Sequence, residues 1–191
     1  MRIGITGASG LGKTTLANEL GNSLGIPVFE ESFADIINSL HYLHKSKTIE
    51  SAQKYLEECI NWIENRKTIT LNKESFICDR VGFDIMSRII LSDLLIDNKN
   101  INLLNLIKEM CIQDSARMNL IVVMPFTESA LHSGKNENEL NRETSLSKKI
   151  KSQSLIIGLL EQYSACKVCL IPTEYETVSE RKKFILEKLN D

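Results

Sequence analysis

Five short apolar runs alternate with longer amphipathic stretches along this chain. The runs are continuous rather than alternating, which is typical of parallel strands that helices cover on both faces. This pattern predicts an α/β fold in three layers, with a five-stranded parallel sheet between two layers of helices. The predicted strands are Arg2–Thr6, Pro27–Glu30, Ser75–Asp79, Asn119–Met124 and Lys167–Ile171.

The stretches between these runs have helical spacing. The first predicted helix ends at Gly25, and Pro27 prevents it from continuing. The polar triplet Asn98–Asn100 predicts a turn, and no linker divides the chain, so residues 1–191 form one expected domain. The predicted helices are Lys13–Leu24, Phe33–His44, Thr48–Thr70, Phe83–Ile96, Ile101–Met110, Arg142–Tyr163 and Thr177–Leu189.

One polar stretch, about residues 127–149, interrupts this alternation of apolar runs and helical stretches. It directly follows a predicted strand, at the edge of the sheet where open α/β folds bind ligands. Arg142, Lys148, Lys149 and Lys151 come at near-helical spacing. They form either a solvated helix face or part of a lid that closes over phosphates and excludes water. Arg142 is the preferred candidate for a catalytic residue of this lid.

Composition narrows the classes of protein. The chain has 191 residues and a formal net charge of -2, with a pI near 6.0, so no overall positive field attracts nucleic acid or an anionic membrane. No apolar run reaches the roughly 20 residues of a membrane span, and we expect no signal peptide. Five scattered cysteines suit reduced thiols, so we expect a cytoplasmic protein.

The stretch between the first strand and the first helix carries the strongest chemical signal. It reads G-A-S-G-L-G-K-T-T and matches the phosphate-binding pattern G-x-x-x-x-G-K-[ST] in the strand-to-helix context that this pattern requires. Its glycines allow backbone N–H groups to point at an anion, and the helix N-terminus attracts negative charge. A turn that merely caps the helix is the alternative. The predicted nucleotide-binding residues are Gly7, Ala8, Ser9, Gly10, Leu11, Gly12, Lys13, Thr14 and Thr15.

Within this loop, two side chains have distinct predicted roles. Lys13 would reach the β- and γ-phosphates of ATP, and the Thr14 hydroxyl would bind Mg²⁺. Asp79 ends the third strand and would support the same Mg²⁺ ion. The sequence therefore predicts ATP and Mg²⁺ as the cofactors.

Further charged residues follow the second and third predicted strands. Glu30 and Glu31 are candidate bases that would accept the proton of an acceptor hydroxyl, or they are exposed strand-end acids. Arg80 would bind a phosphate bidentately, or it would pair with Asp79 or Asp84. Asp84 is one helical turn from Arg88, which predicts that these two residues brace one another.

Taken together, these motifs resemble the small P-loop kinases. The phosphate loop, the acidic strand end at Glu30 and Glu31, and Asp79-Arg80 followed by Asp84 are similar to a single-domain ATPase/kinase family that includes nicotinamide riboside kinase domains, and to nucleoside and thymidylate kinases. The resemblance implies the strand order 2-3-1-4-5, a lid after the fourth strand with Arg142 as its arginine, and phosphoryl transfer from ATP·Mg²⁺.

The leading hypothesis is a kinase for a nucleoside, a nucleoside monophosphate or a similar small metabolite. A nucleotide-binding regulatory ATPase or switch is the second hypothesis. A kinase acting on nucleic acid is the third, and the weak overall charge disfavours it, although the lysines of the predicted lid could form a local basic surface. The oligomeric state stays open, with a homodimer as one option.

Overall fold

The sheet has five parallel strands in the order β2-β3-β1-β4-β5, as expected. The computed structural model of this chain describes all residues except 31–35, 37–40, 42–45, 93–96, 128–144 and 191. In the central strands, Ile5 lies opposite Asp79 on one side and Val122 on the other. The strands are β1 (Arg2–Thr6), β2 (Val28–Glu30), β3 (Phe76–Asp79), β4 (Leu120–Val123) and β5 (Lys167–Leu170).

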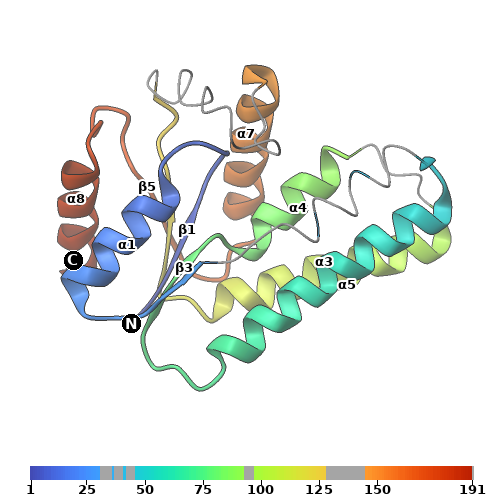
Figure 1. The fold of residues 1–191 in the computed structure, drawn as a ribbon, viewed down its shortest axis with the longest axis horizontal. Helices are drawn as coiled ribbons and strands as arrows, with labels where there is room; N and C mark the ends of the chain where they lie inside the picture. Colours follow the sequence, from blue (N-terminus) through green and yellow to red (C-terminus); the bar gives the residue numbers. More distant parts are fainter. Residues whose placement is uncertain (31–35, 37–40, 42–45, 93–96, 128–144, 191) are drawn as a thin grey trace.

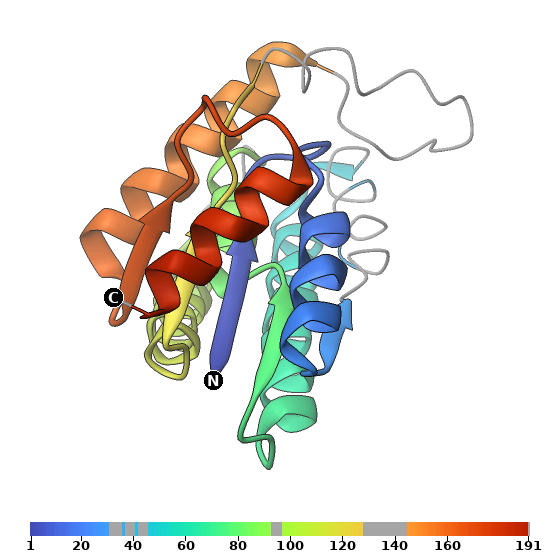
Figure 2. The same ribbon diagram turned by 90° about the vertical axis from the view of Figure 1, so that its left-hand side faces the viewer.

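Helices cover both faces of the sheet, which confirms the three-layer prediction (Figures 1 and 2). One layer contains α1 and α8, and the other contains α3, α4, α5 and α7. The described helices are α1 (Lys13–Leu24), α3 (Ile49–Thr70), α4 (Gly82–Ile90), α5 (Asn98–Ala116), α7 (Leu146–Tyr163) and α8 (Val178–Asn190).

Alternate residues of each strand enter two separate hydrophobic cores. Ile3 and Ile5 of β1 pack with α1 and α8, together with Ile77 of β3. The neighbouring residues of β3, Phe76 and Cys78, face the opposite core beneath α3, α4 and α5. All of these side chains are fully buried, which explains why the strands read as continuous apolar runs in the sequence.

One predicted turn is wrong. Residues Asn98–Asn100 form the first turn of α5, which also continues past the predicted end at Met110. The carboxylate of Asp97 caps this helix, because its Oδ1 accepts a hydrogen bond from the backbone N–H of Asn100 at 2.7 Å. Side-chain capping and burial of Asn100 outweigh the turn preference of the asparagines.

The other helices agree with their predictions except near the ends. The predicted helix Phe83–Ile96 corresponds to α4, which ends at Ile90. The helix after the polar stretch begins at Leu146, and residues 142–144 lie outside the described part. The predicted helix Phe33–His44 lies largely outside it as well. Within the described residues, every helix is too short or too polar to cross a membrane.

Candidate nucleotide and acceptor site

The phosphate loop lies between β1 and α1. Gly7, Gly10 and Gly12 have φ angles of 133°, 84° and 82°, a region that glycine enters without the steric cost other residues incur. Gly12 is the N-cap of α1, and no side chain caps the helix there. The N-terminal N–H groups of α1 can therefore bind an anion together with the loop.

Lys13 is buried inside this loop. Its Nζ donates hydrogen bonds to the carbonyl oxygens of Gly7 at 2.8 Å and Ala8 at 2.7 Å, and its exposed fraction is 5%. Burial, followed by the nearby charge of Arg80, lowers the pKa of Lys13 to about 8. The loop thus holds an ammonium group in an environment that favours an added negative charge.

Two side chains from distant helices hold the loop in place. Gln153 of α7 accepts a hydrogen bond from the N–H of Ala8 and donates one to the carbonyl of Met124, both at 2.8 Å. Arg181 of α8 donates to the carbonyl of Leu11 at 3.2 Å. These roles could not be predicted from the sequence, because contacts to backbone atoms of residues 145 and 170 positions away leave no local sequence pattern.

Asp79 and Thr14 meet at the start of α1. The Thr14 hydroxyl donates a hydrogen bond to Oδ2 of Asp79. The other carboxylate oxygen, Oδ1, is buried and has no hydrogen-bond partner among the described residues. A buried carboxylate oxygen without a partner is costly, and a carboxylate beside a Thr hydroxyl is a typical partial coordination shell for Mg²⁺. The residues present therefore fit a Mg²⁺ ion.

Arg80 and Asp84 form an ion pair after β3. Nη1 of Arg80 lies 3.9 Å from Oδ1 of Asp84. The second carboxylate oxygen of Asp84 accepts hydrogen bonds from the Thr6 hydroxyl at 2.7 Å and from the N–H of Val81 at 2.8 Å. Asp84 thus pairs with Arg80, one of the two acidic partners predicted for this arginine. The predicted bracing of Asp84 by Arg88 stays a prediction.

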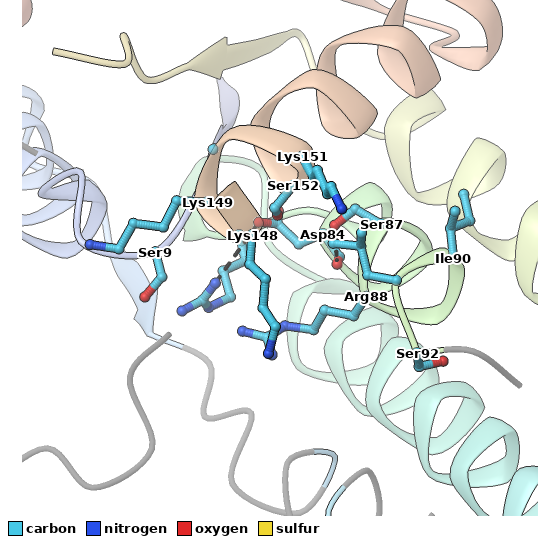
Figure 3. Close-up of a pocket in the computed structure, with 13 residues that line it drawn as sticks. Ser9, Asp84, Ser87, Arg88, Ile90, Ser92, Lys148, Lys149, Lys151 and Ser152 are labelled. Carbon is cyan, nitrogen blue, oxygen red and sulfur yellow. Dashed lines mark hydrogen bonds and ion pairs between the residues drawn. The ribbon is translucent and has the colours of Figure 1, made fainter. Parts of the chain in front are cut away.

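A cavity of about 450 Å³ opens beside the loop, between α4 and α7 (Figure 3). Figure 3 shows Lys149 extending toward Ser9, and Lys148 and Arg88 pointing toward one another from α7 and α4. Burial and the charge of Arg80 lower the pKa of Arg88. Among its described lining residues, Asp84 is the one acidic side chain, and the cationic ones are Arg80, Arg88, Lys148, Lys149 and Lys151.

The predicted residues are only partly brought together. Lys13, Thr14, Asp79 and Arg80 meet at the loop, and Lys149, named in the predicted lid, is buried beside it. Glu30 is exposed at the end of β2, and its carboxylate accepts a hydrogen bond from Nδ2 of Asn18 at 2.7 Å. Glu31, Arg142 and residues 128–144 of the predicted lid lie outside the described part of the chain.

Solved structures with this fold include several small kinases. Deoxyadenosine kinase from M. mycoides, with dCMP and dCDP bound, has a TM-score of 0.71 and 17% identity, and the alignment covers 100% of this chain and 99% of that chain. Thymidylate kinase from Ehrlichia chaffeensis has a TM-score of 0.58 and 13% identity, with 99% and 98% covered. NadR in complex with NAD and AMP-PNP has a TM-score of 0.62 and 16% identity, with 99% of this chain and 48% of that chain covered.

These likenesses establish the fold of the small P-loop kinases, as the sequence motifs suggested. No curated protein sequence matches this chain. A family model does match: the model described as AAA domain, AAA_28, aligns with residues 2–181. The chain therefore belongs to this AAA domain family.

Proposed function

We propose that this protein is a kinase that transfers the γ-phosphoryl group of ATP to a nucleoside or nucleotide in the presence of Mg²⁺. One observation carries the proposal. Lys13, Thr14 and Asp79 converge at the N-terminus of α1, directly beside a cationic cavity large enough for a small-molecule acceptor. The fold shared with deoxyadenosine and thymidylate kinases supports it.

In this proposal each residue has a defined electrostatic task. The loop N–H groups and Lys13 bind the phosphates and stabilise the charge that develops on the transferred group. Thr14 and Asp79 hold Mg²⁺, which when bound neutralises charge on the phosphate oxygens. Arg80 lies where it can bind the transferred group, since its guanidinium lines the cavity.

The residues outside the described part keep their proposed roles. Arg142 is the proposed lid arginine, and Glu31 shares with Glu30 the proposed role of base for a hydroxyl acceptor. For Glu30 this role requires its carboxylate to leave Asn18 and turn toward the acceptor. We also keep the cytoplasm as the proposed location, in agreement with five free cysteines.

ADP release in the presence of candidate acceptors tests the proposal. Purified protein with ATP and Mg²⁺ should release ADP faster when the correct nucleoside or nucleotide is added, and Lys13→Ala should abolish this stimulation. Lys73→Ala is the matched control, because Lys73 is exposed and precedes β3 at the opposite edge of the sheet. ATP binding without stimulation by any small acceptor would instead favour a nucleotide-dependent switch.

A further inference from the structure

Arg80, which lines the cavity beside the phosphate loop, has an unusual backbone conformation. Its φ angle of 112° lies among the positive values that residues with a side chain rarely adopt. Because the direction of the Cα–Cβ bond depends on φ, this conformation determines where the guanidinium points. Such outliers persist only where the surrounding structure holds them, and they concentrate at functional sites.

Hydrogen bonds hold the backbone on both sides of this residue. The N–H of Arg80 donates to the carbonyl of Ile5 in β1 at 2.8 Å, and its own carbonyl accepts from Nη1 of Arg66 at 2.6 Å. The next two N–H groups of the chain donate to carboxylates, that of Asp84 at 2.8 Å and that of Asp114 at 3.0 Å. Three consecutive N–H groups and the carbonyl between them thus have partners, which fixes the path of the turn.

Two of these partners come from other helices and also hold each other. Nε of Arg66 in α3 lies 3.0 Å from Oδ1 of Asp114 in α5, and both side chains are buried. The guanidinium of Arg66 lies over the ring of Trp62, one turn earlier in α3, at 5.7 Å from the ring centroid. Neither Arg66 nor Asp114 is among the described lining residues of the cavity. They therefore reach the site through the backbone of the turn, not by touching a ligand.

We infer that Arg66 and Asp114 are positioning residues for phosphoryl transfer: together they hold Arg80 in the conformation that directs its guanidinium to the cavity. The inference rests on the proposed kinase function, in which Arg80 binds the transferred group. Misplacing a group that stabilises the transition state by about 1 Å can reduce the rate about 100-fold. A change at either position should therefore lower kcat, and should alter the affinity for ATP less, because the loop and Lys13 bind the phosphates of ATP.

Arg66→Lys tests this role while it keeps the positive charge beside Asp114. The single ammonium group of a lysine cannot reproduce the geometry in which Nη1 and Nε bind two partners. We expect kcat to fall about 10- to 100-fold and KM for ATP to change by less than about threefold. Asp114→Asn keeps an acceptor for the N–H of Gly82, should have the same effect, and remains informative if Arg66→Lys folds poorly.

A double-mutant cycle with Arg80→Gln separates positioning from a general structural effect. In the Arg80→Gln background, Arg66→Lys should change the residual kcat by less than about twofold, because the group that it positions is absent. A fall in kcat by the same factor in both backgrounds would overturn the inference, and so would a rise in KM for ATP with an unchanged kcat. Both results would leave the kinase function intact.

A further variant and the unaltered protein complete the experiment. Ile63→Val, at a buried position of the same helix, is the control for stability: it should lower the thermal midpoint and leave kcat unchanged. A loss of kcat in this control as large as that in Arg66→Lys would contradict a specific role of Arg66. No transfer by the unaltered protein to any nucleoside or nucleotide would overturn the proposed function, and this inference with it.

Discussion

Lys13 is buried, and the surrounding loop stabilises its positive charge poorly. Desolvation and the neighbouring Arg80 bring its pKa from 10.5 to about 8, despite two hydrogen bonds to loop carbonyls. In the unfolded protein the pKa returns to its ordinary value, so the buried charge of Lys13 destabilises the fold at neutral pH. As the pH rises from 8 toward 10.5, Lys13 loses its proton in the folded protein first, and this destabilisation disappears. Phosphates of a bound nucleotide act in the opposite direction and favour the charged amine.

The affinity for ATP should therefore depend on pH. Below pH 8 the lysine is already protonated, whereas above it the protein must take up a proton to bind phosphate. We expect Kd for ATP to rise by up to about tenfold per pH unit above pH 8. Calorimetry in buffers with different ionisation enthalpies would measure the proton uptake. Lys13→Met should bind more weakly and lose this slope, and an identical slope in the variant would contradict the account.

The buried oxygen of Asp79 predicts a different phenotype. Asp79→Asn keeps the size of the side chain but removes the charge beside Thr14. Loss of a residue that supports a metal site typically lowers the metal affinity 10- to 100-fold. We therefore expect the Mg²⁺ concentration that half-saturates ATP turnover to rise by about this factor. A Mg²⁺ titration at fixed ATP measures it, and thermal unfolding without ligand serves as the control for folding. An unchanged Mg²⁺ requirement would remove Asp79 from the proposed metal site.

Some residues of the site could be predicted from the sequence, and others could not. Lys13, Thr14 and Asp79 were identifiable because phosphate and Mg²⁺ chemistry restricts residue types at fixed spacings from a strand end. Gln153 and Arg181 were missed because they hold backbone atoms in place, and many polar residues at many positions could do that. The lysines of α7 were noticed, but helical spacing alone could not distinguish a buried Lys149 from an exposed Lys151.

At the level of elements, the turn from β3 to α4 positions most of the charged site. Arg80 has a φ angle of 112°, an unfavourable conformation for a residue with a side chain. Arg66 of α3 donates to the carbonyl of Arg80 at 2.6 Å and pairs with Asp114 of α5 at 3.0 Å. Asp114 in turn accepts a hydrogen bond from the N–H of Gly82 at 3.0 Å. A buried ion pair between two helices thus holds the turn.

Breaking this ion pair should be costly. Asp114→Ala would leave the buried guanidinium of Arg66 without its carboxylate, and such losses cost about 3 to 5 kcal/mol. Urea unfolding measures the free energy. The double variant Arg66→Met with Asp114→Leu should lose less stability than Asp114→Ala, because no buried charge remains. A loss below about 1 kcal/mol for the single variant would show that the pair does not hold the turn.

The contact between α4 and α5 provides a second test at this scale. A Cβ at Gly82 would lie 3.1 Å from both Cα and Sγ of Cys111, and the backbone atom cannot move aside cheaply. Gly82→Ala should therefore destabilise the protein by about 1 to 3 kcal/mol. Gly158→Ala in α7 is the matched control: no atom lies within 4 Å of its added Cβ, so the variant should gain up to about 1 kcal/mol. Equal thermal shifts would contradict the packing argument.

The errors in predicting elements share a physical cause. The asparagines of Asn98–Asn100 favour a turn locally, but Asp97 caps a helix there and the side chain of Asn100 is buried. A short apolar run, by contrast, was sufficient to predict every described strand, because both faces of this sheet are covered. Local patterns succeed where burial is symmetric and fail where a cap or a tertiary contact decides the boundary.

The net charge of the molecule is negative, whereas the cavity beside the phosphate loop is lined mainly by cations. A net charge of -2 coexists with five cations in one cavity. The order of the strands came from the family resemblance rather than from periodicity, since the apolar pattern fixes which segments are strands but not which are neighbours. That order places the ends of β1, β3 and β4 side by side, and the loop, Asp79 and the start of the cavity all lie there.

A compact cationic cavity on an acidic protein should not bind nucleic acid strongly. For proteins that contact 6 to 10 phosphates of a nucleic acid, raising the salt concentration from 50 to 200 mM lowers the affinity by roughly 10³- to 10⁵-fold. We expect kcat/KM for the small acceptor to fall by less than about tenfold over this range. Oligonucleotides should be poor acceptors beside mononucleotides. A steep salt dependence together with oligonucleotide phosphorylation would instead identify a nucleic-acid kinase.

Transfer of a labelled phosphate tests the kinase function most directly. The protein would be incubated with γ-³²P-labelled ATP, Mg²⁺ and a mixture of nucleosides and nucleoside monophosphates, and the products separated by chromatography. We predict a labelled nucleotide that forms with Lys73→Ala as with the unaltered protein, and does not form with Lys13→Ala. Label recovered only in ATP and inorganic phosphate, from protein shown to bind ATP, would contradict phosphoryl transfer to a nucleoside or nucleotide.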